Sequence, residues 1–219
     1  MFSSSIICIG GLPGIGSVGK VAADYLAAAL ECEPARHFFS KGFPAQVVVN
    51  GNVVNLLYAE MKAAKEKGHI FILSGDAQPL EVRGMYFLAD EILEYARSLK
   101  ITDIITLAAY VGASPEKVVG AASDPKTAAE IEDNGIALMR GGAIGGLNGL
   151  LAGLAPLYGM RGLCFLGTTS GENPVDIRAA RNLLETLLPL LGLEVSIEGL
   201  EIGEEEAISS YEETDMNYR

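Results

Sequence analysis

The first thirty residues place a short apolar run, a glycine-rich turn and an alanine-rich segment in direct succession. Residues 5–9 have the β-branched composition of a buried strand, and residues 18–30 have the composition of a helix. When a strand leads into a helix through a short turn, the next strand of the chain usually joins the same sheet in parallel. The helix between the two strands then covers one face of the sheet. This unit therefore directs the chain towards an α/β fold.

The rest of the chain continues this alternation. Strands are predicted over 35–40, 70–73, 103–108 and 163–167, and helices over 81–99, 145–158 and 176–191. Asn50-Gly51 between two valine runs predicts a β-hairpin, and residues 61–67 have the composition of a charged, helix-prone connector. We therefore expect one mixed, mostly parallel sheet covered on both faces, with residues 1–198 as a single α/β domain.

Three helix starts are predicted from a capping residue followed by proline. These pairs are Ser114-Pro115, Asp124-Pro125 and Asn173-Pro174. In the last of them, Asp176 falls at the third helical position, where a carboxylate stabilises the helix amino end.

Charge is concentrated at one end of the chain. The net charge is −12, which argues against nucleic acid or an anionic membrane as the main partner. Residues 199–219 hold seven acidic residues against one arginine, a net charge of −6, and we assign them to an acidic C-terminal extension. The uncharged segment 141–160 is rich in glycine, so we expect a buried helix there and no membrane span.

The cysteines indicate a reducing compartment. Cys8, Cys32 and Cys164 are odd in number and lack metal-site spacing, and the first and last fall in apolar strand signals. We expect Cys8 and Cys164 to pack in the core. Without a signal-peptide pattern, we expect the protein to be cytoplasmic.

The turn after the first strand approaches two nucleotide-binding motifs without completing either. Gly14, Gly16 and Gly19 have dinucleotide-site spacing, but no carboxylate ends the next expected strand. Gly14, Gly19 and Lys20 have P-loop spacing, but Val21 stands where Mg²⁺ needs a Ser or Thr. Either the glycines allow close helix–strand packing, or backbone amides at this helix start hold a phosphate or nucleotide.

Catalytic machinery is sparse elsewhere. His37 and His69 lie in or beside different expected strands, so they form no metal-ligand pair on a helix, and a nucleophile elbow is missing. Residues 168–173 and Gly75-Asp76 follow strands, where α/β folds place ligands, but they serve equally as a helix cap and a turn. We expect no enzyme activity, no cofactor and no metal. A nucleotide- or phosphate-binding enzyme that uses Gly14–Lys20 is the alternative.

Four sequence blocks, in this order, resemble the proteasome assembly chaperone 2 family in its archaeal form. The resemblance covers about residues 6–192. The blocks are Gly11-Leu-Pro-Gly-Ile-Gly-Ser-Val-Gly19, Gly75-Asp-Ala-Gln-Pro79, Gly145-Gly-Leu-Asn-Gly-Leu-Leu-Ala-Gly153, and Leu166-Gly-Thr-Thr169 leading to Asp176-Ile-Arg-Ala-Ala180.

The resemblance implies a fold, an assembly and a partner. The fold is a three-layer α/β/α sandwich similar to the phosphorylase-like fold, without that active site. The assembly is a homo-oligomer, with a paralogue as a further candidate member. The partner is the set of proteasome α-subunits, which the protein would bind as an assembly chaperone or activator without ATP or metal.

The resemblance also assigns a role to the last residues of the sequence. Some members end in a hydrophobic–Tyr–any tripeptide that inserts between α-subunits, and the matching positions here are Asn217, Tyr218 and Arg219. Tyr218 fits this pattern, whereas Asn217 is polar and Met216 lies one place too early. On docking, Tyr218 would contribute ring packing and a hydroxyl hydrogen bond, and the Arg219 carboxylate an ion pair. The acidic segment would keep the arm extended and speed its encounter with a basic surface.

Overall fold

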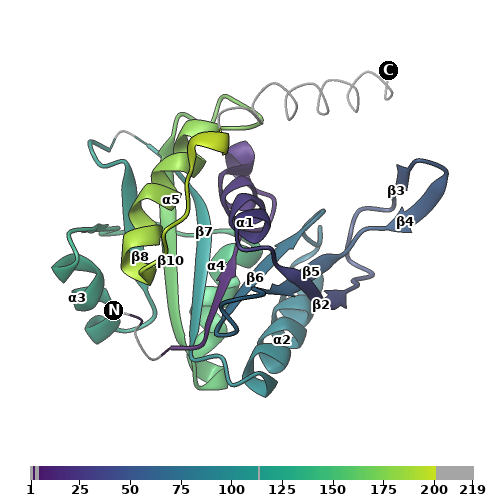
Figure 1. Ribbon diagram of the computed structural model, residues 1–219, viewed down its shortest axis with the longest axis horizontal. Coiled ribbons are helices and arrows are strands. Elements are labelled where there is room, and N and C mark those ends of the chain that lie inside the picture. Colours follow the sequence, from purple (N-terminus) through teal and green to yellow (C-terminus); the bar gives the residue numbers. More distant parts are fainter. Residues whose placement is uncertain (1, 3–4, 113, 201–219) are drawn as a thin grey trace.

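The structure is a computed structural model that describes residue 2, residues 5–112 and residues 114–200. Within these residues, eight strands form one sheet between two helical layers (Figure 1). The strands are β1 (Ile7–Gly10), β2 (Glu33–Phe38), β5 (Ala59–Ala63), β6 (Ile70–Gly75), β7 (Asp103–Val111), β8 (Val118–Ala122), β9 (Ala137–Leu138) and β10 (Arg161–Thr169); β3 (Val47–Asn50) and β4 (Val53–Leu56) form a separate hairpin. The helices are α1 (Val18–Ala29), α2 (Val82–Ser98), α3 (Pro125–Asp133), α4 (Gly146–Leu154) and α5 (Ile177–Leu191), with 3₁₀ turns η1 (Ile15–Ser17), η2 (Ala155–Tyr158) and η3 (Glu198–Leu200).

The sheet has the order β2-β5-β6-β1-β7-β10-β8-β9. Its centre is parallel, because β1 pairs with β6 and β7, and β10 pairs with β7. Antiparallel pairs follow on both sides, β10 with β8 and β5 with β6 and β2. The short β8–β9 pair is parallel, so four of the seven pairs in the described sheet are parallel. This confirms the mixed, mostly parallel sheet.

Each face of the sheet has its own apolar core. On one face, α1 and α5 pack against the isoleucines and leucines of β1, β6, β7 and β10. On the other face, α2 and α4 pack against Cys8, Leu73 and Ile104. The predicted α/β/α sandwich is therefore confirmed, and no helix in the described part is long and apolar enough to cross a membrane.

The connector expected over 61–67 is wrong, because β5 occupies Ala59–Ala63. Its charged side chains alternate with apolar ones: Met61 is fully buried on one face, whereas Glu60 and Lys62 share the opposite face. The pairing between β2 and β6 outweighs the helix propensity of these residues. The short strands β8 and β9 were also not predicted.

One of the three predicted helix starts is confirmed. Asp124 caps α3, and its carboxylate accepts hydrogen bonds from Thr127 N at 2.9 Å and Thr127 Oγ1 at 2.6 Å. The hydroxyl bond, followed by the amide bond, lowers the pKa of Asp124. Ser114-Pro115 leads instead into the β-branched strand β8. Helix α5 begins after Asn173-Pro174, at Ile177, so Asp176 is its cap and not its third residue.

The helix α1 lies unusually close to the sheet. A Cβ added at Gly11 would stand 1.9 Å from Gly19 O, and one added at Gly19 would stand 2.0 Å from Leu107 O. These neighbours are backbone atoms and cannot rotate away. Close helix–strand packing, one of the two hypotheses for this turn, is therefore a structural fact at Gly11 and Gly19.

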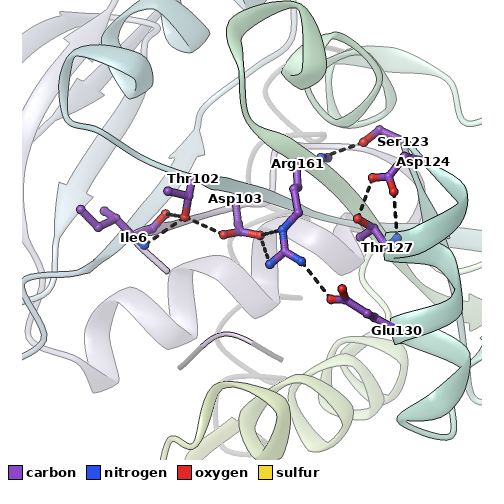
Figure 2. Close-up of polar contacts among 9 residues, drawn as sticks. Ile6, Thr102, Asp103, Ser123, Asp124, Thr127, Glu130 and Arg161 are labelled. Carbon is purple, nitrogen blue, oxygen red and sulfur yellow. Dashed lines mark hydrogen bonds and ion pairs between the residues drawn. The ribbon is translucent and has the colours of Figure 1, made fainter. Parts of the chain in front are cut away.

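At the amino ends of β7 and β10, Arg161 links the sheet to α3 (Figure 2). Its Nε donates to the Asp103 carboxylate at 2.6 Å, and its Nη1 donates to Glu130 at 2.9 Å. The Asp103 side chain is 1% exposed, whereas that of Arg161 is 32% exposed. Thr102 Oγ1 also donates to Asp103 and accepts from Ile6 N next to β1. This network fixes three neighbouring strands at one edge.

The close approach of α1 makes Gly19→Ala strongly destabilising. We expect a loss of at least about 3 kcal/mol, because the new methyl group overlaps the backbone at Leu107. Gly153→Ala is the matched control, since Gly153 is helical and has no atom within 4 Å of its added Cβ. It should stabilise by about 0.5–1 kcal/mol. Urea unfolding measures both, and equal effects would contradict the packing role.

The Arg161 network predicts unequal costs for its two partners. Arg161→Met leaves the buried Asp103 carboxylate without its cation and should cost about 3–5 kcal/mol. Asp103→Asn leaves Arg161 partly exposed and still paired with Glu130, so it should cost only about 1–2 kcal/mol. Chemical denaturation compares the two variants, and the reverse order would contradict this assignment.

The thiols should differ in reactivity. Cys8 and Cys164 are 1% and 2% exposed, as predicted, and burial raises their pKa values to about 12 and about 11. Cys32 is half-buried and free. At mildly alkaline pH, a thiol reagent should label Cys32 first in the native protein and the other two only after unfolding, as peptide mass spectrometry would show.

Candidate functional site: the cleft beside the glycine turn

A cleft of about 580 Å³ opens where β1, β7 and β10 end at their carboxyl edge. This is where open α/β sheets place their ligands. Its walls come from the turn after β1, the end of β7 and the loop that precedes α4. The lining residues are Leu12, Gly14, Ile15, Gly19, Gln78, Ala108, Ala109, Tyr110, Val111, Met139, Gly141, Gly142, Ala143, Ile144, Gly145, Gly146, Asn148 and Leu166.

Gln78 joins two walls of the cleft. Its side-chain Nε2 donates to Pro13 O in the glycine turn. Its Oε1 accepts from Leu147 N in the first turn of α4 at 2.6 Å. The Gln78 side chain therefore satisfies the Pro13 carbonyl of the glycine turn and the Leu147 amide, which has no partner within its own helix. In this way Gln78 holds the glycine turn against the start of α4.

Asn148 makes a second link between the same walls. Its Oδ1 accepts from Leu12 N and its Nδ2 donates to Leu12 O, both at 3.1 Å. Asn148 is 4% exposed, and the pair of bonds supplies Leu12 with the partners that a neighbouring strand would give. Asn148 is therefore a polar residue in an otherwise apolar helix because it satisfies the backbone N–H and C=O groups of Leu12.

The fourth block contacts the glycine turn from the other side. Asp176 N donates to Gly16 O at 2.8 Å, and Asp176 Oδ2 accepts from Thr169 Oγ1 at 2.6 Å. The other carboxylate oxygen of Asp176 accepts from Ala179 N and caps α5. Gly16 has φ 58°, which glycine adopts without strain. All four sequence blocks therefore converge on the turn after β1.

The glycines and the lysine of the alternative nucleotide-binding loop do not line one common site. Gly14 and Gly19 line the cleft. Gly16 packs against Asp176, with only 3.3 Å between its added Cβ and the Asp176 Cβ. Lys20 lines a different pocket, and its Nζ contacts Asp24 at 2.7 Å. A phosphate held in the cleft would therefore lack the lysine that a P-loop supplies.

The pocket that Lys20 lines is polar and has a volume of about 320 Å³. It lies between α1 and the strands β5 and β6, where the register pairs Glu60 with Ser74. Glu60 contacts His37 at 2.7 Å and Lys62 at 3.1 Å. Burial lowers the pKa of Lys62, but the hydrogen bond and charge of Glu60 outweigh it and raise that pKa. This pocket was not predicted from the sequence, although the alternation Ala-Glu-Met-Lys-Ala indicates a strand.

The cleft has little titratable chemistry. Among its described lining residues, the Tyr110 hydroxyl is the one titratable side chain. No cluster of three or more His, Cys, Asp or Glu that could hold a metal occurs in the described ranges. The cleft is thus suited to apolar or neutral hydrogen-bonding groups. The predicted partner-binding residues Asn217, Tyr218 and Arg219 lie outside the described residues.

Two sequence comparisons assign the chain to a family. The profile of the PAC2 family matches residues 8–214. An uncharacterised protein from Methanocaldococcus jannaschii is 34% identical over 200 residues, which make up 89% of this chain and 77% of that protein.

Two crystal structures from Pyrococcus furiosus are similar in both fold and sequence. PbaB, an archaeal proteasome activator, has a TM-score of 0.82 and 29% identity, and the match covers 95% of this chain and 93% of PbaB. PbaA, an archaeal homologue of proteasome-assembly chaperone, has a TM-score of 0.78 and 29% identity over 97% and 90% of the two chains. With the four converging blocks and the profile match, these likenesses establish that the chain belongs to the PAC2 family.

Proposed function

We propose that this protein is an assembly chaperone or activator of the proteasome core particle and that it binds the α-subunits. The observation that carries the proposal is the likeness to PbaB, an archaeal proteasome activator, over 95% of this chain at 29% identity. The likeness to PbaA, a homologue of proteasome-assembly chaperone, supports the same conclusion. The protein would act by binding and not by catalysis.

The glycine turn supports a binding role. In a nucleotide enzyme, backbone amides at such a turn hold the phosphate, and an acidic side chain farther along the chain contacts the ribose. Here the side chains of Gln78 and Asn148 instead bond the backbone at Pro13 and Leu12, and the Asp176 carboxylate bonds Thr169 and caps α5. These residues hold a rigid scaffold together, which suits a protein that presents surfaces to a partner.

The segment from which the acidic extension starts is firmly attached to the body. Leu200, at the end of η3, is 4% exposed and belongs to the core formed by α1 and α5. Tyr25 of α1 donates its hydroxyl hydrogen to Ser196 O at 2.8 Å. We propose that the extension beyond this anchor delivers Asn217, Tyr218 and Arg219 to the α-subunits.

Immobilised α-subunits from the same organism test the proposal, with affinity measured by biolayer interferometry. We expect the full chain to bind, and Tyr218→Ala or deletion of residues 217–219 to weaken binding at least about tenfold, because a buried tyrosine anchor is lost. Raising the salt concentration should slow association, since the segment before Tyr218 is acidic.

Tyr211→Ala is the matched control, because it removes the same side chain from the same extension. Its affinity should stay within about twofold of the full chain. Binding that survives the deletion would place the contact on the α/β body and contradict the tail contact. A full chain that does not bind would overturn the proposed function itself.

A further inference from the structure

The polar pocket between α1 and the strands β5 and β6, which we call the α1–β5 pocket, is separate from the cleft beside the glycine turn. The two share no lining residue in the described chain. Its volume of about 320 Å³ falls at the lower end of the range of small-molecule sites, which is about 300–1,000 Å³. The charged and hydroxyl-bearing residues that carry the argument are Lys20, Asp24, Glu60, Lys62, Ser74 and Asp76.

The strands β5 and β6 supply one wall of this pocket. Their antiparallel register sets Glu60 directly opposite Ser74, so these two side chains share one face of the sheet. Lys62 lies two residues after Glu60 and therefore on the same face. Its partner Ile72 belongs to the core that α1 covers, so this is the face below α1. The strand side chains therefore meet those of α1 across the pocket.

Ser74 is the observation that points to a ligand. It is 6% exposed, and its Oγ is the one buried side-chain polar atom without a hydrogen-bond partner among the described residues. Buried hydroxyl groups in native proteins almost always have a partner, because an unpaired one loses its hydrogen bonds with water. Since Ser74 lines the pocket, a polar group bound there is placed to supply that partner.

Two ammonium groups line the same pocket. Lys20 Nζ contacts Asp24 at 2.7 Å, and Lys62 Nζ contacts Glu60 at 3.1 Å. An ammonium group has three N–H donors, so one carboxylate contact leaves each lysine able to bind a further anionic group. Burial opposes the charge of Lys62, but the hydrogen bond and charge of Glu60 outweigh it and raise the pKa, so Lys62 stays protonated. Lys20 and Lys62 can therefore bind a carboxylate.

The acidic groups provide for a cation. Asp76 Oδ2 accepts from Tyr58 N at 3.1 Å, and this contact leaves the other carboxylate oxygen to a ligand. Asp24 likewise uses Oδ2 for Lys20. The Cys32 thiol adds no charge, because burial raises its pKa more than the charge of Lys62 lowers it. Two lysines and three carboxylates thus give the pocket a net charge of −1.

This balance of charge selects among ligand classes. A free phosphate would be repelled by three carboxylates, and the described residues form no cluster suited to a metal ion. A simple amine would leave the two lysines and the Ser74 hydroxyl without an anionic partner. A molecule with one carboxylate and two cationic groups satisfies both sets of side chains, and its net charge of +1 neutralises the pocket.

We propose that the α1–β5 pocket binds a free basic amino acid, arginine or lysine. The ligand carboxylate contacts Lys20 and Lys62 and accepts the hydrogen bond that Ser74 can donate. The cationic groups of the ligand contact Asp24 and Asp76. This site does not depend on the proteasome as a partner, so the proposed function can fail while this proposal stands, and the reverse.

Isothermal titration calorimetry of the full chain with free L-arginine and L-lysine tests this proposal in the absence of α-subunits. We expect saturable binding at one site per chain. Agmatine, which is arginine without its carboxylate, should bind at least about tenfold more weakly, because the lysines and Ser74 lose their anionic partner. Inorganic phosphate should not compete with arginine.

Ser74→Ala should weaken arginine binding at least about tenfold, because a hydrogen bond to a carboxylate is lost. In the absence of arginine it should leave the urea unfolding midpoint unchanged or raise it, since Ser74 Oγ has no partner to lose in the described chain. Lys20→Met, on the α1 side, should weaken binding to a similar extent. Lys117→Met is the matched control, because Lys117 is 74% exposed and does not line the pocket, and its affinity should stay within about twofold.

A full chain that binds neither arginine nor lysine would overturn the proposal. Arginine binding that survives both Ser74→Ala and Lys20→Met would place the ligand elsewhere and overturn it as well. Agmatine that binds as tightly as arginine would contradict recognition of the carboxylate, and displacement of arginine by phosphate would assign the pocket to simple anions. None of these results would alter the outcome expected with α-subunits.

Discussion

The close contact of α1 with the sheet is the constraint on which the rest of the structure depends. Gly11 and Gly19 leave no room for a Cβ, so the helix backbone lies directly against Leu107 of β7. This closeness draws the turn after β1 down onto the carboxyl edge of the sheet. Gln78, Asn148 and Asp176 can then reach its backbone from three other segments. A wider separation would leave their hydrogen-bonding groups without partners in the interior.

The amino and carboxyl ends of the central strands carry different kinds of polar contact. At the amino end, Arg161, Asp103 and Glu130 form an ionic network that ties strands to α3. At the carboxyl end, Gln78 and Asn148 bond backbone groups beside a cleft with little titratable chemistry. Polar groups in this protein are thus used to fix loops, and exposed apolar groups gather at a hairpin and a groove beside α2.

Much of the fold was predictable because its signals are local. The apolar run before Gly10 predicts β1, and the amphipathic pattern of residues 82–98 predicts α2. Each signal lies within the element itself. Residues 59–63 could not be assigned in this way, since charged side chains favour a helix until two strands pair with them. The start of α5 likewise lies at Ile177, because Asp176 bonds Thr169 in β10 and Gly16 in η1. The sequence around the helix start does not reveal these contacts with other elements.

The sequence by itself determined the alternation of the central strands with the helices that cover them, the hairpin at Asn50-Gly51 and the family resemblance, because these rest on patterns of neighbouring residues. Only the tertiary structure shows where the residues of the glycine turn lie relative to one another. It set Gly14 and Gly19 on the cleft and Lys20 in a separate pocket, a distinction that spacing along the chain does not contain. Tertiary structure also decided which valines lie beyond the core. Identical valines are buried in β8 and exposed in β3, because only the fold places a helix over one of them.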